Sequence, residues 1–222
     1  MKSYKFISIS ILLLVVINKI CISQITFTIN TGTSIPVGDF AIDDPWNDKS
    51  GLAGTGMAAG IQCIYPLNER GLGFLSSVDF ILNPTSNDAR KKWEDFNSEA
   101  DFKFPKAINI PVSAGINYIF TPDEKISLYG KAALSASFLK FTDFMVQQYG
   151  YEDYTEEYDF SAALGFILGA GIKANKISIG FNYMILGEHK TSGIWEEGPN
   201  TGKLEQEIKN ISLITLTAGW NF

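Results

Sequence analysis

The segment ISLITLTAGWNF, residues 211–222, alternates apolar side chains with small or polar ones. Its apolar positions are Ile214, Leu216, Ala218, Trp220 and Phe222, and the positions between them are Thr215, Thr217, Gly219 and Asn221. Successive side chains of a β-strand point to opposite faces, so this pattern predicts a strand with one oily face and one slender polar face. The same alternation recurs upstream along the chain.

Period-two alternation predicts eight strands in all. Their expected ranges are 25–37, 52–65, 72–83, 107–120, 126–141, 158–173, 177–187 and 210–222. No stretch between them has a sustained helical period, so we expect no helix. The outward face of a soluble sandwich commonly carries Lys, Arg, Asp and Glu. Here the non-oily face is Gly, Ser, Ala, Thr and Asn, which favours the crowded lumen of a narrow barrel whose oily face meets lipid.

The connections between the predicted strands alternate in length. Short turns are expected near 66–71, 121–125 and 174–176. The long connections, near 39–51, 84–106, 142–157 and 188–209, hold 19 of the 24 acidic residues. Short periplasmic turns and long external loops are typical of bacterial outer-membrane barrels. The sequence therefore predicts an all-β fold, an eight-stranded antiparallel up-and-down transmembrane β-barrel.

The first 23 residues have the pattern of an export signal peptide. Lys2 and Lys5 precede an apolar run, residues 6–17, that is shorter than the roughly 20 residues of a membrane-spanning helix. Cleavage after Ser23 leaves a barrel domain of residues 24–222 with 15 basic and 24 acidic residues, a balance that argues against nucleic-acid binding. Processing as a lipoprotein at Cys21 is the alternative, but Ile20 is bulky where that pathway needs a small residue.

Few charges fall inside the predicted strands. Asp79 and Lys131 both lie on the polar face, and we expect them in a lumen network that side chains fill. Pro111 removes a ladder donor inside the fourth strand, so a bulge or a locally unpaired position is expected there. Two aromatic girdles are expected, with Tyr65, Tyr118, Phe120, Trp220 and Phe222 at the short turns and Phe138, Phe141, Tyr158 and Phe160 near the loops.

Three segments carry a family resemblance: IPVGDF at 35–40, INIPVSAGINYIF at 108–120, and the terminal aromatic residue. With them the mature chain resembles outer-membrane β-barrel proteins of the Bacteroidetes type, eight-stranded barrels of the OmpA or OmpX kind. The resemblance implies a location in the outer membrane, surrounded by its lipid. It also implies recognition of the last strand by the barrel-assembly machinery through Phe222 and Trp220. It supplies no catalytic residues and no cofactor.

His189 is the only histidine, and it lies at the start of the last long connection. A Ser-His-acid hydrolase needs a serine beside it in space, and Ser192 in the same loop gives no such constraint. We therefore expect a solvated loop histidine and no enzyme. Carboxylates cluster in the first and third long connections, at Asp39, Asp43, Asp44 and Asp48 and at Glu152, Asp153, Glu156 and Glu157. Neither cluster has EF-hand spacing, so a hydrated acidic surface is expected and not a metal site.

Aromatic side chains accompany the acids of the last two long connections. Tyr149, Tyr151, Tyr154 and Trp195 form a candidate binding surface, because such side chains supply contact area at low entropic cost. Anchoring of the loops to the barrel rim is the alternative. The predicted function is non-enzymatic: a structural, adhesion or recognition role at the cell surface, with the loop ligand unknown. The alternatives are a narrow channel, a lipid-modifying enzyme, and a secreted lipocalin-like barrel with its oily face inward.

Overall fold

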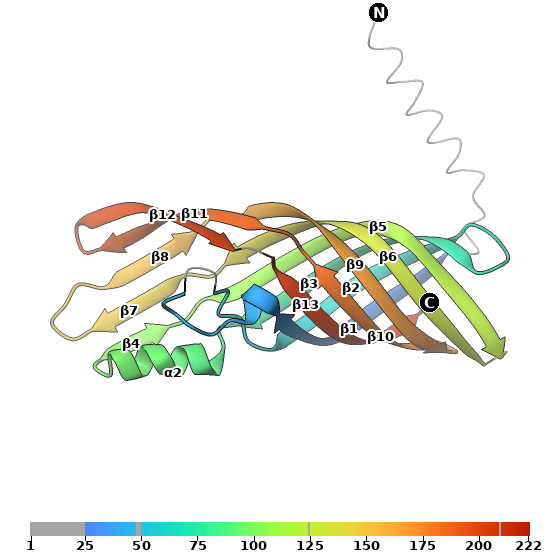
Figure 1. Ribbon diagram of the computed structural model, residues 1–222, viewed down its shortest axis with the longest axis horizontal. Helices are drawn as coiled ribbons and strands as arrows, with labels where there is room; N and C mark the ends of the chain where they lie inside the picture. Colours follow the sequence, from blue (N-terminus) through green and yellow to red (C-terminus); the bar gives the residue numbers. More distant parts are fainter. Residues whose placement is uncertain (1–24, 48–49, 124, 209) are drawn as a thin grey trace, which may run out of the picture.

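The structure is a computed structural model that describes residues 25–47, 50–123, 125–208 and 210–222. In it, eight antiparallel strands close into a barrel in the order β1-β13-β10-β9-β6-β5-β3-β2 (Figure 1). These strands are β1 (Thr26–Val37), β2 (Gly56–Pro66), β3 (Leu72–Pro84), β5 (Lys106–Asp123), β6 (Ile126–Phe141), β9 (Ser161–Ala174), β10 (Ile177–Ile185) and β13 (Ser212–Asn221). The predicted fold is confirmed, while the predicted signal peptide lies outside the described residues.

Side chains alternate along each barrel strand between an exposed outer face and a buried lumen. At the end of the chain Trp220 is 48% exposed and Phe222 69%, whereas Asn221 between them is buried. The outer belt also includes Phe27, Ile29, Phe74, Val78, Phe80, Val112, Ile116, Leu134, Leu164, Leu168, Ile179 and Phe181. A closed barrel with an apolar exterior is the arrangement that lipid requires.

Pro111 leaves one stretch of the β3–β5 ladder unpaired without changing its register. Pairing stops after Val78 and Val112 and resumes at Ile81 and Asn109, which is the same alignment on both sides of the gap. On its other edge Pro111 still lies opposite Ser137 of β6. Of the two expected outcomes, the locally unpaired position is the observed one.

The lumen is layered, which the polar-face pattern did not predict. Polar side chains line the half near the short turns, among them Thr28, Gln62, Asn117, Lys131 and Ser178. The half near the long connections is fully buried and contains the large apolar residues Phe40, Ile81, Leu139, Leu186, Ile211 and Leu213. Hydrogen-bonded polar pairs, Ser34 with Asn83 and Ser137 with Asn109, lie among them. The apolar side chains gather here because this end continues into further folded structure, so they pack against protein and not against water.

Three of the four long connections fold into a second sheet that projects beyond the barrel (Figure 1). Its strand order is β12-β11-β8-β7-β4. The strands are β4 (Ala100–Lys103), β7 (Phe144–Gln148), β8 (Tyr154–Tyr158), β11 (His189–Glu197) and β12 (Asn200–Ile208). We call this sheet, together with the helix described next, the extension. The expectation of plain loops between the barrel strands is therefore wrong.

A helix, α2 (Asn87–Phe96), also corrects the expectation that the chain contains none. Ser86 caps it, because the Ser86 Oγ accepts a hydrogen bond from the Ala89 N–H at 3.1 Å. Its apolar residues Ala89, Trp93 and Phe96 do follow a helical period, but only over ten residues of mostly charged sequence. A short 3-10 turn, η2 (Gly38–Ala41), follows β1. No helix in the described ranges is long and apolar enough to cross a membrane.

Two residues predicted in the outer aromatic girdle do not lie on the outer face of the barrel. Phe141 ends β6 on the lumen side, and Tyr158 belongs to β8 and not to the sixth barrel strand. Their ring centroids are 5.5 Å apart at the junction between barrel and extension. The predicted alternation fails here because the chain changes sheets at Asp159, whose N–H donates to the Ser192 carbonyl at 2.8 Å.

Candidate binding cleft

One face of the projecting sheet is aromatic and acidic. Strand register sets this face, since residues directly opposite on paired strands share a side of the sheet. The rows of opposed residues across β7, β8 and β11 are Val146, Tyr154 and Glu197, and Phe144, Glu156 and Trp195. The other face carries mainly polar residues such as Gln147, Thr155 and Glu196.

Helix α2 covers part of this aromatic face. The Trp93 ring lies 5.9 Å from the Phe144 ring and 6.1 Å from the Phe102 ring, centroid to centroid. The helix is held from outside by an ion pair between Lys92 Nζ and Asp43 Oδ1 at 3.1 Å. Trp46 adds a ring contact to Trp93 at 6.4 Å. These contacts fix α2 on the sheet edge without closing the space between them.

That space is a cleft of about 370 Å³. Its lining residues are Leu52, Thr85, Trp93, Phe104, Pro105, Phe144, Val146, Tyr154, Glu156, Tyr158 and Glu197. A mostly apolar concave site with a few placed polar groups is the usual form of a small-ligand site, and this volume lies in the usual range. We refer to it as the aromatic cleft.

Glu156 is the organised polar group of the aromatic cleft. Its Oε1 accepts a hydrogen bond from the Tyr154 hydroxyl at 2.7 Å, and its Oε2 accepts one from the Tyr158 hydroxyl. Burial raises the pKa of both tyrosines well above 10, and the nearby carboxylate adds to the effect. Both phenols therefore remain protonated donors at neutral pH, and they hold the carboxylate in place.

The candidate surface residues divide into two groups. Tyr154 and Trp195 come together, with stacked rings whose centroids are 6.3 Å apart, and Tyr154 lines the aromatic cleft. Tyr149 and Tyr151 lie at the tip between β7 and β8, where their side chains are 101% and 73% exposed. The structure thus brings two of the four candidate residues together and leaves the other two apart from them at the tip.

Sequence reasoning missed Trp93, Phe104 and Phe144 as cleft residues. The signal was present as short period-two runs inside the long connections, in DFKF at 101–104 and FMVQQ at 144–148. Runs of this length do not by themselves predict a strand. Whether they form strands depends on which connections pair with each other, and the sequence pattern does not indicate that pairing.

The interpretation of His189 as a solvated loop residue is wrong. It begins β11, its side chain is fully buried, and its Nδ1 lies 3.3 Å from the Ser161 Oγ. Burial lowers the pKa of His189 below its usual 6.5, so the ring is neutral at physiological pH. Ser192, the serine considered as its partner from the sequence, instead donates to the Asp159 Oδ2 at 2.8 Å.

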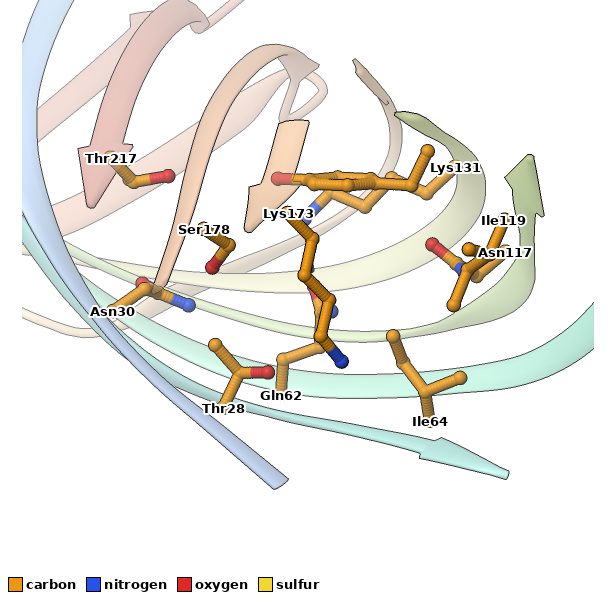
Figure 2. A pocket seen from close by; sticks show the side chains of 11 residues that line it. Thr28, Asn30, Gln62, Ile64, Asn117, Ile119, Lys131, Lys173, Ser178 and Thr217 are labelled. Carbon is orange, nitrogen blue, oxygen red and sulfur yellow. Dashed lines mark hydrogen bonds between the residues drawn. The ribbon is translucent and has the colours of Figure 1, made fainter. Parts of the chain in front are cut away.

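Asp79 and Lys131 both point into the lumen. The Lys131 Nζ donates to the Gln62 Oε1 at 3.0 Å, and the Ser77 Oγ donates to the Asp79 Oδ2 at 3.2 Å. Figure 2 shows Lys131, Lys173 and Gln62 around a small pocket of about 30 Å³. Such a space holds about one or two water molecules, so side chains fill the polar layer of the lumen.

The remaining candidates are placed as follows. In the described part of the chain no group of three or more metal-ligating side chains comes together. Asp43 of the first acidic cluster pairs with Lys92, and Glu156 of the third connection faces the aromatic cleft. Trp220 and Phe222 point outward at the short-turn end of the barrel, where the backbone N–H of Phe222 donates to the Phe27 carbonyl at 2.9 Å.

Solved outer-membrane proteins are similar in fold. A major outer membrane protein from Thermus thermophilus gives a TM-score of 0.50 at 11% identity, over 89% of this chain and 99% of that chain. Neisserial surface protein A gives 0.46 at 17% identity, over 89% and 96%. The attachment invasion locus protein Ail of Yersinia pestis, in complex with the heparin analogue sucrose octasulfate, gives 0.43 at 16% identity, over 90% and 99%.

At such identities a likeness shows the fold alone. The closed eight-stranded barrel and its likeness to the Thermus protein confirm the predicted architecture of an outer-membrane barrel. A Bacteroidetes origin is not supported. No protein-family model and no curated protein matches the sequence.

Proposed function

We propose that this chain is an outer-membrane surface protein that binds a ligand outside the cell in its aromatic cleft. The observation that carries the proposal is that three of the long connections form one folded extension with a lined cleft, and not separate loops. The barrel anchors this extension, and the outer-membrane lipid covers its apolar belt. Recognition of a ligand by a rigid scaffold requires no catalysed reaction, so the proposed role is non-enzymatic.

The same proposal includes biogenesis. Phe222 and Trp220 are exposed at the last strand and fit a signal read by the barrel-assembly machinery after export. The side chains of Asp79 and Lys131 serve as a filled lumen network that braces the barrel. Neither role requires a cofactor or a bound metal.

Site-directed labelling tests the location and the open cleft together. The background is Cys63→Ser, because Cys63 is the free cysteine of the described chain. Single cysteines replace Tyr151 at the extension tip, Val146 in the aromatic cleft and Arg70 in a short turn. A membrane-impermeant maleimide is then applied to intact cells and to lysed cells.

We expect Tyr151→Cys to react on intact cells, Val146→Cys to react there more slowly, and Arg70→Cys to react only after lysis. Labelling of Arg70→Cys on intact cells would reverse the orientation and refute the proposal. Failure of Val146→Cys to react even after lysis would show that the cleft is closed to solutes, which also refutes it.

A further inference from the structure

The aromatic cleft carries negative charge without a matching positive charge. Glu156 and Glu197 are its charged lining residues, and its lining contains no Lys or Arg. Within the described ranges neither carboxylate takes part in an ion pair. Glu156 is half-buried, so its carboxylate loses part of its hydration and gains from a positively charged partner, while Glu197 is exposed at the margin of the cleft.

The walls of the cleft are suited to a particular kind of positive charge. Phe144 is the central ring, 5.9 Å from Trp93, 6.1 Å from Phe104 and 6.5 Å from Tyr154, centroid to centroid. The negative faces of such rings attract cations, most strongly where water is excluded. The chain already uses one of these rings in this way, since the Arg90 guanidinium lies 5.5 Å from the Phe104 centroid.

Hydrogen bonding leaves the charge of Glu156 available. Both of its oxygens accept from the tyrosine hydroxyls of Tyr154 and Tyr158, which position the carboxylate but do not neutralise it. Glu197 lies directly opposite Tyr154 on β11 and places a second negative charge at the cleft. One cation near Tyr154 is therefore attracted by two carboxylates and by the aromatic rings.

We propose that the aromatic cleft binds an organic cation, a substituted ammonium group with apolar substituents. The proposal rests on the surface-binding role proposed above and adds the ligand class. Anionic ligands are repelled by the two carboxylates. A hard metal ion needs six or more oxygens that the rings do not supply. A neutral apolar ligand leaves the carboxylates uncompensated, whereas an alkylammonium group satisfies rings and charges together.

Calorimetric titration of the purified full-length protein with choline tests this inference. The matched probe is 3,3-dimethylbutan-1-ol, which has the same shape but no charge. The detergent is a maltoside and the buffer is phosphate, so that no other organic cation is present. We expect saturable binding of choline and about tenfold weaker binding of the neutral alcohol.

Two neighbouring residues supply a matched pair of variants. Glu197→Gln removes a carboxylate at the cleft, and Glu196→Gln makes the same change one residue away on the opposite face of the sheet. We expect Glu197→Gln to weaken choline binding about tenfold and Glu196→Gln to leave it unchanged. Phe144→Leu keeps the apolar volume but removes the central ring, and it should also weaken binding. Near-ultraviolet circular dichroism confirms that each variant is folded.

Three results would overturn the inference: no choline binding in the millimolar range, equal affinity for choline and the alcohol, or equal effects of Glu196→Gln and Glu197→Gln. If any of these occurs while Val146→Cys still reacts on intact cells, the ligand class is wrong and the surface-binding role stands. If Val146→Cys is unreactive, both proposals fail.

Discussion

His189 is a neutral side chain fixed at the point where the extension leaves the barrel. Burial lowers the pKa of His189 below 6.5, so the folded protein resists protonating it. The unfolded segment protonates freely below pH 6.5, and therefore binds more protons than the folded one as pH falls. The stability of the extension is complete above pH 6.5 and decreases as pH falls below it.

The first prediction is that mild acid loosens the extension through His189. Between about pH 8 and pH 5 few other groups titrate, because this is the only histidine. Limited proteolysis of β11 should accelerate about tenfold for each pH unit over which only the unfolded form is protonated. His189→Gln should lose this acceleration. An identical pH response in wild type and variant would contradict the assignment.

The hydroxyls of Tyr154 and Tyr158 give the opposite pH dependence. The pKa of each is raised above 10, by burial first and then by the Glu156 carboxylate. Their contribution to stability is complete below pH 10 and is lost as pH rises above it. Glu156→Gln removes the charge, so two tyrosines should ionise at lower pH in an ultraviolet titration. Tyr154→Phe/Tyr158→Phe in the same background should remove that shift, and its persistence would contradict the model.

At the scale of single elements, β12 is shaped by the ring that lies across it. Gly202 is opposite Trp195, and a Cβ added at Gly202 would overlap the Trp195 Nε1. Because Gly202 has no side chain, the indole ring of Trp195 fits over this position and stacks beside Tyr154. A small residue in one strand thus positions an aromatic residue in the next.

Gly202→Ala should therefore displace Trp195 and destabilise the extension by about 1–3 kcal/mol. Hydrogen exchange of the β11 and β12 amides measures this local stability. Thr201→Ala changes the neighbouring residue on the opposite face and serves as the control. Unchanged exchange in Gly202→Ala, or an equal effect of Thr201→Ala, would show that the ring does not depend on this gap.

How well an element was predictable depends on where its partners lie. The strand from 126 to 141 was predicted with the bounds it has in the structure, because long alternation and a short turn determine its pairing locally. The strands of the extension were not predicted, since β4 pairs with β7 and β8 with β11 across long separations in sequence. For the same reason Phe144 was not predicted as a cleft residue, and Tyr158 was wrongly predicted on the outer face of the barrel.

At the scale of the whole molecule, the two sheets share one core. Phe40, Leu139 and Leu213 seal the barrel from the extension side, and Ile208 and Ile211 continue the apolar packing into the connection after β12. The barrel is thus closed by its own connections. A ligand in the aromatic cleft would lie on the extension side of these buried residues.

Conductance in planar bilayers tests this picture of a closed barrel. The polar layer leaves a pocket of only about 30 Å³, and buried side chains that include Phe40, Leu139 and Leu213 fill the lumen on the extension side, so the wild-type protein should show no single-channel steps. The variant Tyr129→Ala/Lys131→Ala removes two large side chains from the polar layer. It should also show no conductance, because Phe40, Leu139 and Leu213 still fill the lumen on the extension side. Adding Leu139→Ala and Leu213→Ala removes two large side chains from the extension side of the lumen as well. The quadruple variant should conduct ions if both halves of the lumen must be widened before ions can pass. Steps in the wild-type protein would instead show that the lumen opens spontaneously, and the narrow-channel function would replace the closed anchor.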